Sequence, residues 1–364
     1  MRSMKVNLDK KLLSSYEICI GNSIGDRMAL LISKNHKANR HIIVTDSNVG
    51  PLHAQKLLAG LRDVGLNAEL IEFSAGEASK NINIVLDITA QLLKLGADRN
   101  SMLIALGGGV VGDMVGFIAS VFMRSIPYIQ VPTTLLAQVD SSIGGKTAID
   151  LPYGKNLLGT FYQPRAVFAD LSYLGTLPDK EFNNGMAEVI KYGIIDDEKM
   201  FRLLEEKMAP VKGKDPALLL KIVENCCRIK KSIVEIDEKE QGLRRILNYG
   251  HTLGHALEAQ SSFTLAHGEA VALGMIAAAR ISENSGYLDP ASRERIERIV
   301  GEAGLPVRIP QDMATEGILS RLKMDKKKEG DVIHFVLLKK IGMPFVNGGV
   351  DDKIIIPVIE GMKS

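Results

Sequence analysis

The first half of the chain alternates short apolar runs with stretches of helical periodicity. Runs typical of buried strands occupy residues 41–46, 68–73, 101–106 and 128–131. Helical patterns lie between and after them, at residues 54–64, 82–95 and 112–122. Strands that alternate with helices are typical of a parallel sheet covered by helices on both faces. We therefore expect an α/β domain with a parallel sheet over residues 1–178.

After residue 178 the strand-like runs give way to helical patterns. These patterns cover residues 179–192, 199–208, 217–236, 248–259, 269–285 and 291–303. Pro216 lies at the start of one pattern and Gly286 just past the end of another, as is common for these residues at helix ends. We expect a second, mainly α-helical domain over residues 179–364.

The composition agrees with two globular domains and narrows the class of protein. A chain of 364 residues is too long for one compact core. Its net charge of +2 makes no general case for a nucleic acid or an anionic membrane as partner. The three cysteines contain no C-x-x-C pair, and residues 1–9 lack the apolar core of a signal peptide. We expect a cytoplasmic protein without a disulfide framework.

Residues 102–123 form one mostly apolar stretch that is long enough to be compared with a membrane span. The stretch contains Gly107-Gly-Gly109 and a charge at Asp113. Both features suit a buried strand, a tight turn and a helix better than a membrane span. We expect the second arrangement.

The glycine-rich turn is a candidate nucleotide site. The strand at residues 101–106 runs into Gly107-Gly-Gly-Val-Val-Gly-Asp113 and then into a helix. Glycines let backbone N–H groups approach a ligand, and a helix N-terminus favours a pyrophosphate. The order differs from G-x-G-x-x-G, so a tight turn without a ligand is the alternative. Asp46, at a strand end, could bind ribose hydroxyls or simply cap a turn.

Histidines gather in one short region and indicate a metal site. His251 and His255 are four residues apart, on one face of a helix, and His267 follows twelve residues later. Glu188 lies on an apolar helix, where either a metal or Lys191 at i+3 could balance its charge. Two histidines and one carboxylate suit zinc or a similar divalent ion and leave positions open for a substrate.

Cationic side chains accompany both candidate sites. Lys146 and Lys155 lie in segments that read as glycine-rich loops, and Arg244 and Asn248 come just before His251. Together with Lys191, they suggest a substrate that carries both a phosphate and a carboxylate.

On these residues the sequence resembles the 3-dehydroquinate synthases, which catalyse the second step of the shikimate pathway. The resemblance rests on blocks that follow one another in order from about residue 45 to about residue 340. They are Gly107–Asp113, Gln130-Val-Pro-Thr-Thr-Leu-Leu-Ala-Gln-Val-Asp-Ser-Ser-Ile-Gly-Gly-Lys146, Ala187-Glu-Val-Ile-Lys-Tyr-Gly193, Asp237-Glu238, Gly242-Leu-Arg244, Asn248-Tyr-Gly-His-Thr-Leu-Gly-His-Ala-Leu-Glu258, His267-Gly-Glu-Ala-Val271 and Asp325-Lys-Lys327.

The resemblance implies a Rossmann-like NAD-binding domain at residues 1–178 and a helical metal- and substrate-binding domain at residues 179–364. It also implies NAD, one Zn²⁺ or Co²⁺, and a homodimer. The implied metal ligands are Glu188, His251 and His267, with His255 facing the substrate. The implied NAD site consists of Asp46, Glu77, Lys80, Gly108, Gly109, Asp113, Thr133, Thr134, Lys146, Lys155 and Thr176.

The same resemblance implies a substrate site. Its residues would be Lys146, Lys155, Asn156, Lys191, Lys230, Arg244, Asn248, His255 and Lys326, with Asp140 beside the substrate hydroxyls. Arg124 would reach the phosphate from the partner subunit. Lys326 is one of three consecutive lysines, so its neighbours are alternatives for this position.

The implied reaction converts 3-deoxy-D-arabino-heptulosonate 7-phosphate to 3-dehydroquinate and phosphate. It proceeds by transient oxidation with NAD, β-elimination of phosphate, re-reduction, ring opening and aldol closure. Three other functions compete with it. Another sugar-phosphate cyclase would use a substrate without the carboxylate, a metal-dependent polyol dehydrogenase would release NADH, and a scaffold protein would have no activity.

Overall fold

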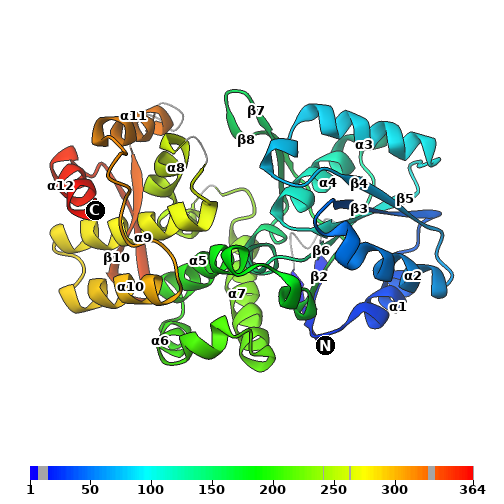
Figure 1. Ribbon diagram of the computed structural model, residues 1–364, viewed down its shortest axis with the longest axis horizontal. Helices are drawn as coiled ribbons and strands as arrows, with labels where there is room; N and C mark the ends of the chain where they lie inside the picture. The colour runs from blue at the N-terminus through cyan, green and yellow to red at the C-terminus, as the bar shows by residue number, and fades with distance from the viewer. Residues whose placement is uncertain (7–14, 241, 262–263, 327–332, 364) are drawn as a thin grey trace. The chain divides into compact units, whose positions relative to one another are not determined.

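The computed structural model describes residues 1–6, 15–240, 242–261, 264–326 and 333–363 (Figure 1). The chain divides into two compact units. Unit 1 comprises Met1–Pro178 and Leu219–Lys239, and unit 2 comprises Asp179–Leu218 and Glu240–Ser364. Residues 219–239, which follow the expected boundary after residue 178, are grouped with unit 1. This segment belongs to unit 1 because side chains of its helix bond there: Cys227 Sγ, for example, donates to the carbonyl oxygen of Gln138 at 3.3 Å.

Unit 1 contains a sheet of seven described strands in the order β4-β3-β5-β6-β9-β2-β1. Every neighbouring pair is parallel except β1 and β2. The strands are β1 (Arg2–Val6), β2 (Tyr16–Gly21), β3 (Arg40–Asp46), β4 (Ala68–Phe73), β5 (Ser101–Gly107), β6 (Tyr128–Pro132) and β9 (Ala166–Asp170). The predicted parallel sheet is confirmed.

Helices cover both faces of this sheet (Figure 1). One face packs against α1 (Gly25–Asn35) and α2 (Gln55–Asp63), and the other against α3 (Ile82–Lys94) and α4 (Gly109–Val121). Strand β5 is buried on both sides because successive side chains point to opposite faces. Its Ile104 and Leu106 join the first core, while Leu103 and Ala105 join the second.

The apolar stretch at residues 102–123 folds as expected into a strand, a tight turn and a helix. Helix α4 begins at Gly109, three residues earlier than predicted, because Gly108 is already in the extended conformation of an N-cap. The carbonyl oxygen of Gly108 accepts the first helical hydrogen bond, from Gly112 N–H at 3.0 Å. No described helix is long and apolar enough to cross a membrane.

Lys146 and Lys155 do not lie in loops, so that prediction is wrong. They belong to an antiparallel hairpin formed by β7 (Lys146–Leu151) and β8 (Gly154–Phe161). Gly159 lets the two strands lie close together, because a Cβ atom on it would lie 2.4 Å from the carbonyl oxygen of Thr147.

The remaining elements of unit 1 are α7 (Pro216–Ile236), which begins in unit 2, and the short turns η1 (Gly50–Ala54), η2 (Glu77–Ser79), η3 (Phe122–Arg124), η4 (Ala137–Ser141) and η5 (Leu171–Thr176).

Unit 2 is built around the buried helix α9 (His267–Asn284), which contacts α5, α8, α10, α12 and β10 (Figure 1). Its other elements are α5 (Asp179–Ile195), α6 (Glu198–Lys212), η6 (Leu243–Asn248), α8 (His251–Gln260), α10 (Pro290–Glu302), α11 (Thr315–Lys326), β10 (His334–Lys340), β11 (Met343–Gly348) and α12 (Asp352–Met362). The helix predicted at residues 248–259 is two elements, because Gly250 adopts φ +79° between them.

Candidate active site

The glycine-rich turn lies at the point where the order of the strands in the sheet of unit 1 reverses. The chain passes from β3 to β4 on one side and from β5 to β6 on the other, with β3 and β5 adjacent. In open α/β sheets, ligands bind outside the carboxyl ends of the strands at such a switch point. Asp46 ends β3 and Gly107 ends β5, so the two sequence signals meet there.

The turn is shaped to receive an anion. No described side chain caps the N-terminus of α4, and the first amides of a helix have no acceptor within the helix itself. A Cβ atom on Gly108 would lie 3.0 Å from Thr134 Cγ2, and one on Gly109 would lie 3.3 Å from Ser141 Oγ. Thr133 Oγ1 is buried and has no hydrogen-bond partner within the described part of the chain. An orphaned buried hydroxyl beside open amides fits a bound nucleotide.

Asp46 also has an ordinary structural task. Its Oδ1 accepts hydrogen bonds from the amides of Asn48 and Val49, each at 2.9 Å. This is the turn-cap role that the sequence left open. Thr176, from η5, reaches the same region, because its Oγ1 lies 2.9 Å from Nε2 of His53, which follows β3.

A network of charges lies beside the turn. The buried Lys80 donates from Nζ to Asp113 Oδ2 at 2.7 Å and to Asn156 Oδ1 at 2.6 Å. Burial alone would lower the pKa of Lys80, but the carboxylates of Asp113 and Glu77 raise it above its usual value. Lys155 Nζ lies 3.7 Å from Glu77 Oε1. The five residues form one charge-balanced cluster on η2, α4 and β8 and the loop after η2.

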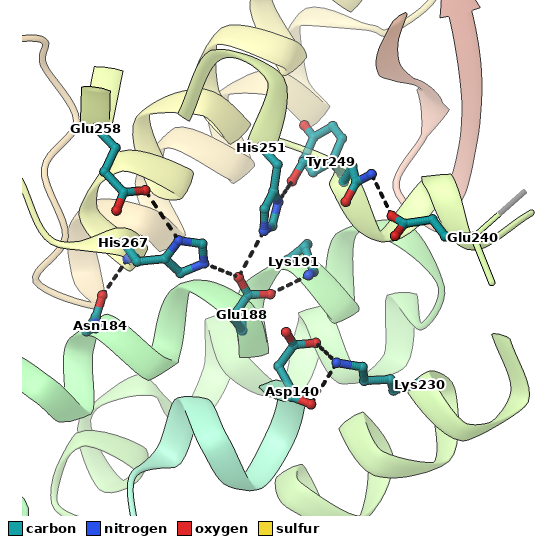
Figure 2. A network of polar contacts seen from close by, with 12 residues as sticks. Asp140, Asn184, Glu188, Lys191, Lys230, Glu240, Tyr249, His251, Glu258 and His267 are labelled. Carbon is teal, nitrogen blue, oxygen red and sulfur yellow. Dashed lines mark hydrogen bonds and ion pairs between the residues drawn. The ribbon is translucent and has the colours of Figure 1, made fainter. Parts of the chain in front are cut away.

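Asp140 is held by Lys230, as Figure 2 shows. Lys230 Nζ donates to both the backbone oxygen and Oδ1 of Asp140, each at 2.7 Å. The pair joins η4 to α7, and Lys230 is buried. Two further predicted residues of unit 1, Lys146 and Arg124, are exposed. Arg124 has φ +68° between Met123 at +51° and Ser125 at +92°, a run of left-handed residues without a glycine.

Three residues of unit 2 form a candidate metal centre (Figure 2). Glu188 Oε1 lies 3.5 Å from His251 Nε2 and 3.3 Å from His267 Nε2. One donor atom from each residue lies within 4.8 Å of the others. Glu188 comes from α5, while His251 and His267 are the first residues of α8 and α9. A carboxylate and two imidazoles are donors that suit a divalent transition metal.

Close backbone contacts bring these elements together. A Cβ atom on Gly254 would lie 3.0 Å from the carbonyl oxygen of Ala270, so α8 and α9 pack with their backbones in contact. Asn184, one turn before Glu188 on α5, accepts a hydrogen bond from the amide of Gly268. This contact fixes the first turn of α9, and with it His267, relative to the carboxylate. Asn184 was not predicted, because nothing in its local sequence marks it.

The charges of the cluster are set by burial and by neighbouring cations. Burial would raise the pKa of the fully buried Glu188, but Lys191 and His251 outweigh it and hold this pKa well below its usual range. Burial would lower the pKa of His267, but the nearby carboxylates of Glu188 and Glu258 raise it to about 9. Burial and then Lys191 lower the pKa of His251. Without metal, the positive charges of Lys191 and protonated His267 face the negative charges of Glu188 and Glu258, and a divalent ion would replace the proton.

His255 stands apart from this group. Its ring centroid lies 5.3 Å from that of His251 and 6.4 Å from that of His267. In the described chain the gathered donors are those of Glu188, His251 and His267. Helical spacing alone therefore could not choose between His255 and His267 as the second imidazole.

The remaining predicted residues of unit 2 lie near η6 and at the end of α11. Arg244 is buried in η6, and Asn248 Nδ2 donates to Glu240 Oε1 at 2.9 Å. Glu240 was not predicted. Lys326 ends α11, but its side chain, like all of Lys327 and Lys328, lies outside the described residues.

Comparisons with known proteins agree with this arrangement. Residues 70–184 match the family "3-dehydroquinate synthase N-terminal", and residues 185–328 match "3-dehydroquinate synthase C-terminal". The 3-dehydroquinate synthase of Desulforamulus reducens is 42% identical over 99% of this chain and 99% of its own.

Two solved structures share the fold closely. One is 2-deoxy-scyllo-inosose synthase complexed with carbaglucose-6-phosphate, NAD⁺ and Co²⁺, with a TM-score of 0.89, 27% identity, and coverage of 99% of this chain and 100% of that one. The other is 2-epi-5-epi-valiolone synthase from Streptomyces hygroscopicus with NAD⁺ and Zn²⁺ bound, with a TM-score of 0.89, 26% identity, and coverage of 98% and 99%. The family matches span more than half of the chain and the curated relative nearly all of it, so this protein belongs to the 3-dehydroquinate synthase family.

Proposed function

We propose that the protein is a 3-dehydroquinate synthase that converts 3-deoxy-D-arabino-heptulosonate 7-phosphate to 3-dehydroquinate and phosphate. We also propose that it binds NAD and one divalent ion, Zn²⁺ or Co²⁺. The observation that carries the proposal is the near full-length similarity to 3-dehydroquinate synthases. The gathered donors of Glu188, His251 and His267 support the metal requirement.

When bound, NAD would accept and return a hydride, and the divalent ion would act as a Lewis acid at the hydroxyl group being oxidised. Glu188, His251 and His267 would hold the ion. The open amides at Gly108 and Gly109 would bind the pyrophosphate of the dinucleotide. The rest of the dinucleotide would contact Asp46, Glu77, Lys80, Asp113, Thr133, Thr134, Lys146, Lys155 and Thr176.

The cationic residues would orient the substrate by its two anionic ends. The buried guanidinium of Arg244 can bind a carboxylate through two parallel hydrogen bonds. Lysine ammonium groups suit the phosphate, and Asp140, fixed by Lys230, can accept a hydrogen bond from a substrate hydroxyl. The other proposed substrate residues are Lys146, Lys155, Asn156, Lys191, Asn248, His255 and Lys326. Fixing both ends of a reactive molecule supplies much of the rate enhancement in such a reaction.

The function can be tested with purified protein, the heptulosonate phosphate, Zn²⁺ or Co²⁺, and NAD well below the substrate concentration. We expect phosphate and dehydroquinate in equal amounts over many turnovers per NAD, without accumulation of NADH. No phosphate release at any metal concentration would refute the proposal.

The same assay separates the two competing enzyme classes. A polyol dehydrogenase would consume NAD in proportion to product, which would appear as a steady rise in NADH absorbance. Another sugar-phosphate cyclase would release phosphate from a phosphorylated sugar without a carboxylate but not from the heptulosonate. Arg244 supports the acid substrate, because a guanidinium can bind a carboxylate through two parallel hydrogen bonds, which a sugar phosphate without a carboxylate cannot form.

We propose a homodimer in which Arg124 of each subunit serves the partner's substrate phosphate. The strained left-handed backbone that presents this exposed arginine supports a functional role. Mixing inactive Arg124→Ala and His267→Ala proteins under exchange conditions should restore about a quarter of wild-type activity, since half of the dimers would be mixed and each would hold one intact site. No recovery in mixed dimers would refute the role in trans.

A cytoplasmic location is also proposed. Cys19, Cys226 and Cys227 are buried thiols, which suits a reducing compartment. Fractionation of the native cells would test it, and enrichment outside the cytoplasm would contradict it.

A further inference from the structure

Glu258 is a buried carboxylate that has no role in the proposed reaction. It lies on α8, seven residues after His251, and is 5% exposed. Its Oε2 lies 3.7 Å from Nδ1 of His267, which Figure 2 shows as a contact from the side opposite to Glu188. Burying a carboxylate is costly unless a partner offsets the loss of hydration, so this position calls for an explanation.

The two nitrogens of the His267 ring face two different carboxylates. Nε2 points at Glu188 Oε1, and Nδ1 points at Glu258 Oε2. A neutral imidazole carries one proton, and the nitrogen that binds a metal must offer its lone pair. For Nε2 to face the ion, the proton has to stay on Nδ1. An anionic acceptor on the Nδ1 side stabilises this tautomer and turns the ring toward the ion.

His251 meets the same requirement by another route. Its Nδ1 lies 3.2 Å from the backbone carbonyl oxygen of Tyr249, which can accept the proton of the ring. His267 is the first residue of α9. The group beside its Nδ1 is a side-chain carboxylate, that of Glu258, and not a backbone carbonyl oxygen. Of the two orienting acceptors, Glu258 is the one that a substitution can remove.

Glu258 is not needed to fix the backbone of α9. The amide of Gly268 bonds to Asn184, and the amide of Ala266 donates to Glu269 Oε2 at 2.8 Å. These hydrogen bonds give the amides of Ala266 and Gly268 their acceptors without Glu258. Glu258 instead contacts the imidazole ring of His267 and can fix its orientation.

We propose that Glu258 is a positioning residue of the metal site, which holds the Nδ1 proton of His267 and so presents Nε2 to the ion. The proposal rests on the proposed function in one respect, namely that Glu188, His251 and His267 bind a divalent ion. It adds a residue to which neither the sequence motif nor the proposed reaction assigned a task.

The test is metal affinity, measured on metal-free protein by titration with Zn²⁺ against a chromogenic chelator. Glu258→Gln keeps the shape of the side chain and removes its charge. We expect the affinity for Zn²⁺ to fall about 10- to 100-fold, the usual effect of losing an outer partner of a ligating histidine. Glu258→Asp, which retains the charge, should recover part of the loss. The thermal midpoint of the metal-free protein should stay close to the wild-type value.

A matched control is available in the same unit. Glu205 is a partly buried carboxylate paired with Arg295 and Arg298, away from any histidine of the site. Glu205→Gln should leave the affinity for Zn²⁺ unchanged, although it breaks an ion pair of similar kind.

A second readout addresses the tautomer directly. Long-range ¹H–¹⁵N NMR spectra of metal-free protein at a pH where His267 is neutral should show the Nδ1–H form in the wild type and a shift toward the Nε2–H form in Glu258→Gln. Wild-type affinity and an unchanged tautomer in Glu258→Gln would overturn the proposal while leaving the enzymatic function intact. Failure of the wild type to bind any divalent ion would overturn both.

Discussion

The carbonyl oxygen of Gly250 occupies the space that a side chain on Gly274 would fill, 1.8 Å from the position of its missing Cβ. The same oxygen accepts the amide hydrogen of Gly254 at 3.0 Å, so it cannot turn away without breaking the first turn of α8. This contact brings the N-terminal residue of α8, His251, against α9. The position of His251 in the metal centre therefore depends on Gly274, although Gly274 is not adjacent in sequence to any of the three candidate ligands.

We predict that Gly274→Ala destabilises unit 2 by about 1–3 kcal/mol, the usual range for overpacking a close contact, and lowers metal affinity as α8 is displaced. Urea unfolding and Zn²⁺ titration would measure the two effects. Gly301→Ala is the control: this exposed glycine lies inside α10, with Val307 Cγ1 at 3.4 Å as the only described neighbour of its added methyl group. That change should be neutral or stabilising by about 0.5–1 kcal/mol. Equal stability of the two variants would contradict the packing argument.

A pair of substitutions can distinguish the proposed metal ligand His267 from the neighbouring His255, which is expected to contact the substrate. His267→Ala should lose bound metal and most turnover, because it removes one of three gathered donors. His255→Ala should retain metal while losing turnover, since His255 is expected to face the substrate. Metal content by atomic spectroscopy, beside steady-state rates and circular dichroism, would distinguish them. Normal metal content in His267→Ala would refute the assignment.

Periodicity and local motifs were sufficient for much of this fold. The alternating strands of unit 1 and the helices of unit 2 follow from side-chain patterns that repeat within each element. The same patterns identify an apolar face without saying what covers it. The bounds of helix α7 were predicted almost to the residue, but its pattern does not indicate that most of the helix groups with unit 1.

The limits at the site have a similar cause. The i,i+4 spacing of His251 and His255 is a local property of one helix, whereas the gathered donors come from three helices. The residues alone left His251, His255 and His267 open as ligands beside Glu188, and the resemblance to a family selected His251 and His267. Asn184 and Glu258 act through contacts across helices, so no local signal marks them. The glycines around Lys146 and Lys155 suggested loops, but these segments pair as two strands, and Gly159 allows close contact between them.

Arg244 provides a test of substrate recognition. Arg244→Ala should raise KM for the heptulosonate phosphate about 10- to 100-fold, because a charge-assisted bidentate contact is lost. Arg244→Lys keeps the charge but not the planar fork, so it should recover only part of the effect. The neighbouring Arg245→Ala, at a partly exposed position of the same turn, should leave KM unchanged. Unaltered kinetics in Arg244→Ala would exclude the carboxylate contact.

His41 should make the stability of the protein depend on pH below neutrality. Its Nε2 lies 3.0 Å from the carbonyl oxygen of His36 and must donate to it, so Nδ1 carries the lone pair of the neutral ring. Nδ1 is buried without a partner among the described residues, and the residue is fully buried. Protonation would place an unsatisfied charged donor in the core, which is why burial lowers the pKa of His41.

The sign of the effect follows from proton uptake. In the unfolded chain His41 has its ordinary pKa of about 6.5, so below that pH the unfolded state binds a proton that the native state refuses. The contribution of His41 is fully present above about pH 6.5 and is lost progressively as the pH falls from there through the lower pKa of the folded state. His41→Gln can keep the hydrogen bond to His36 but cannot take up the proton. The free energy of unfolding, measured in urea between pH 7.5 and pH 5, should therefore decline less steeply in the variant than in the wild type, and parallel curves would show that His41 does not contribute.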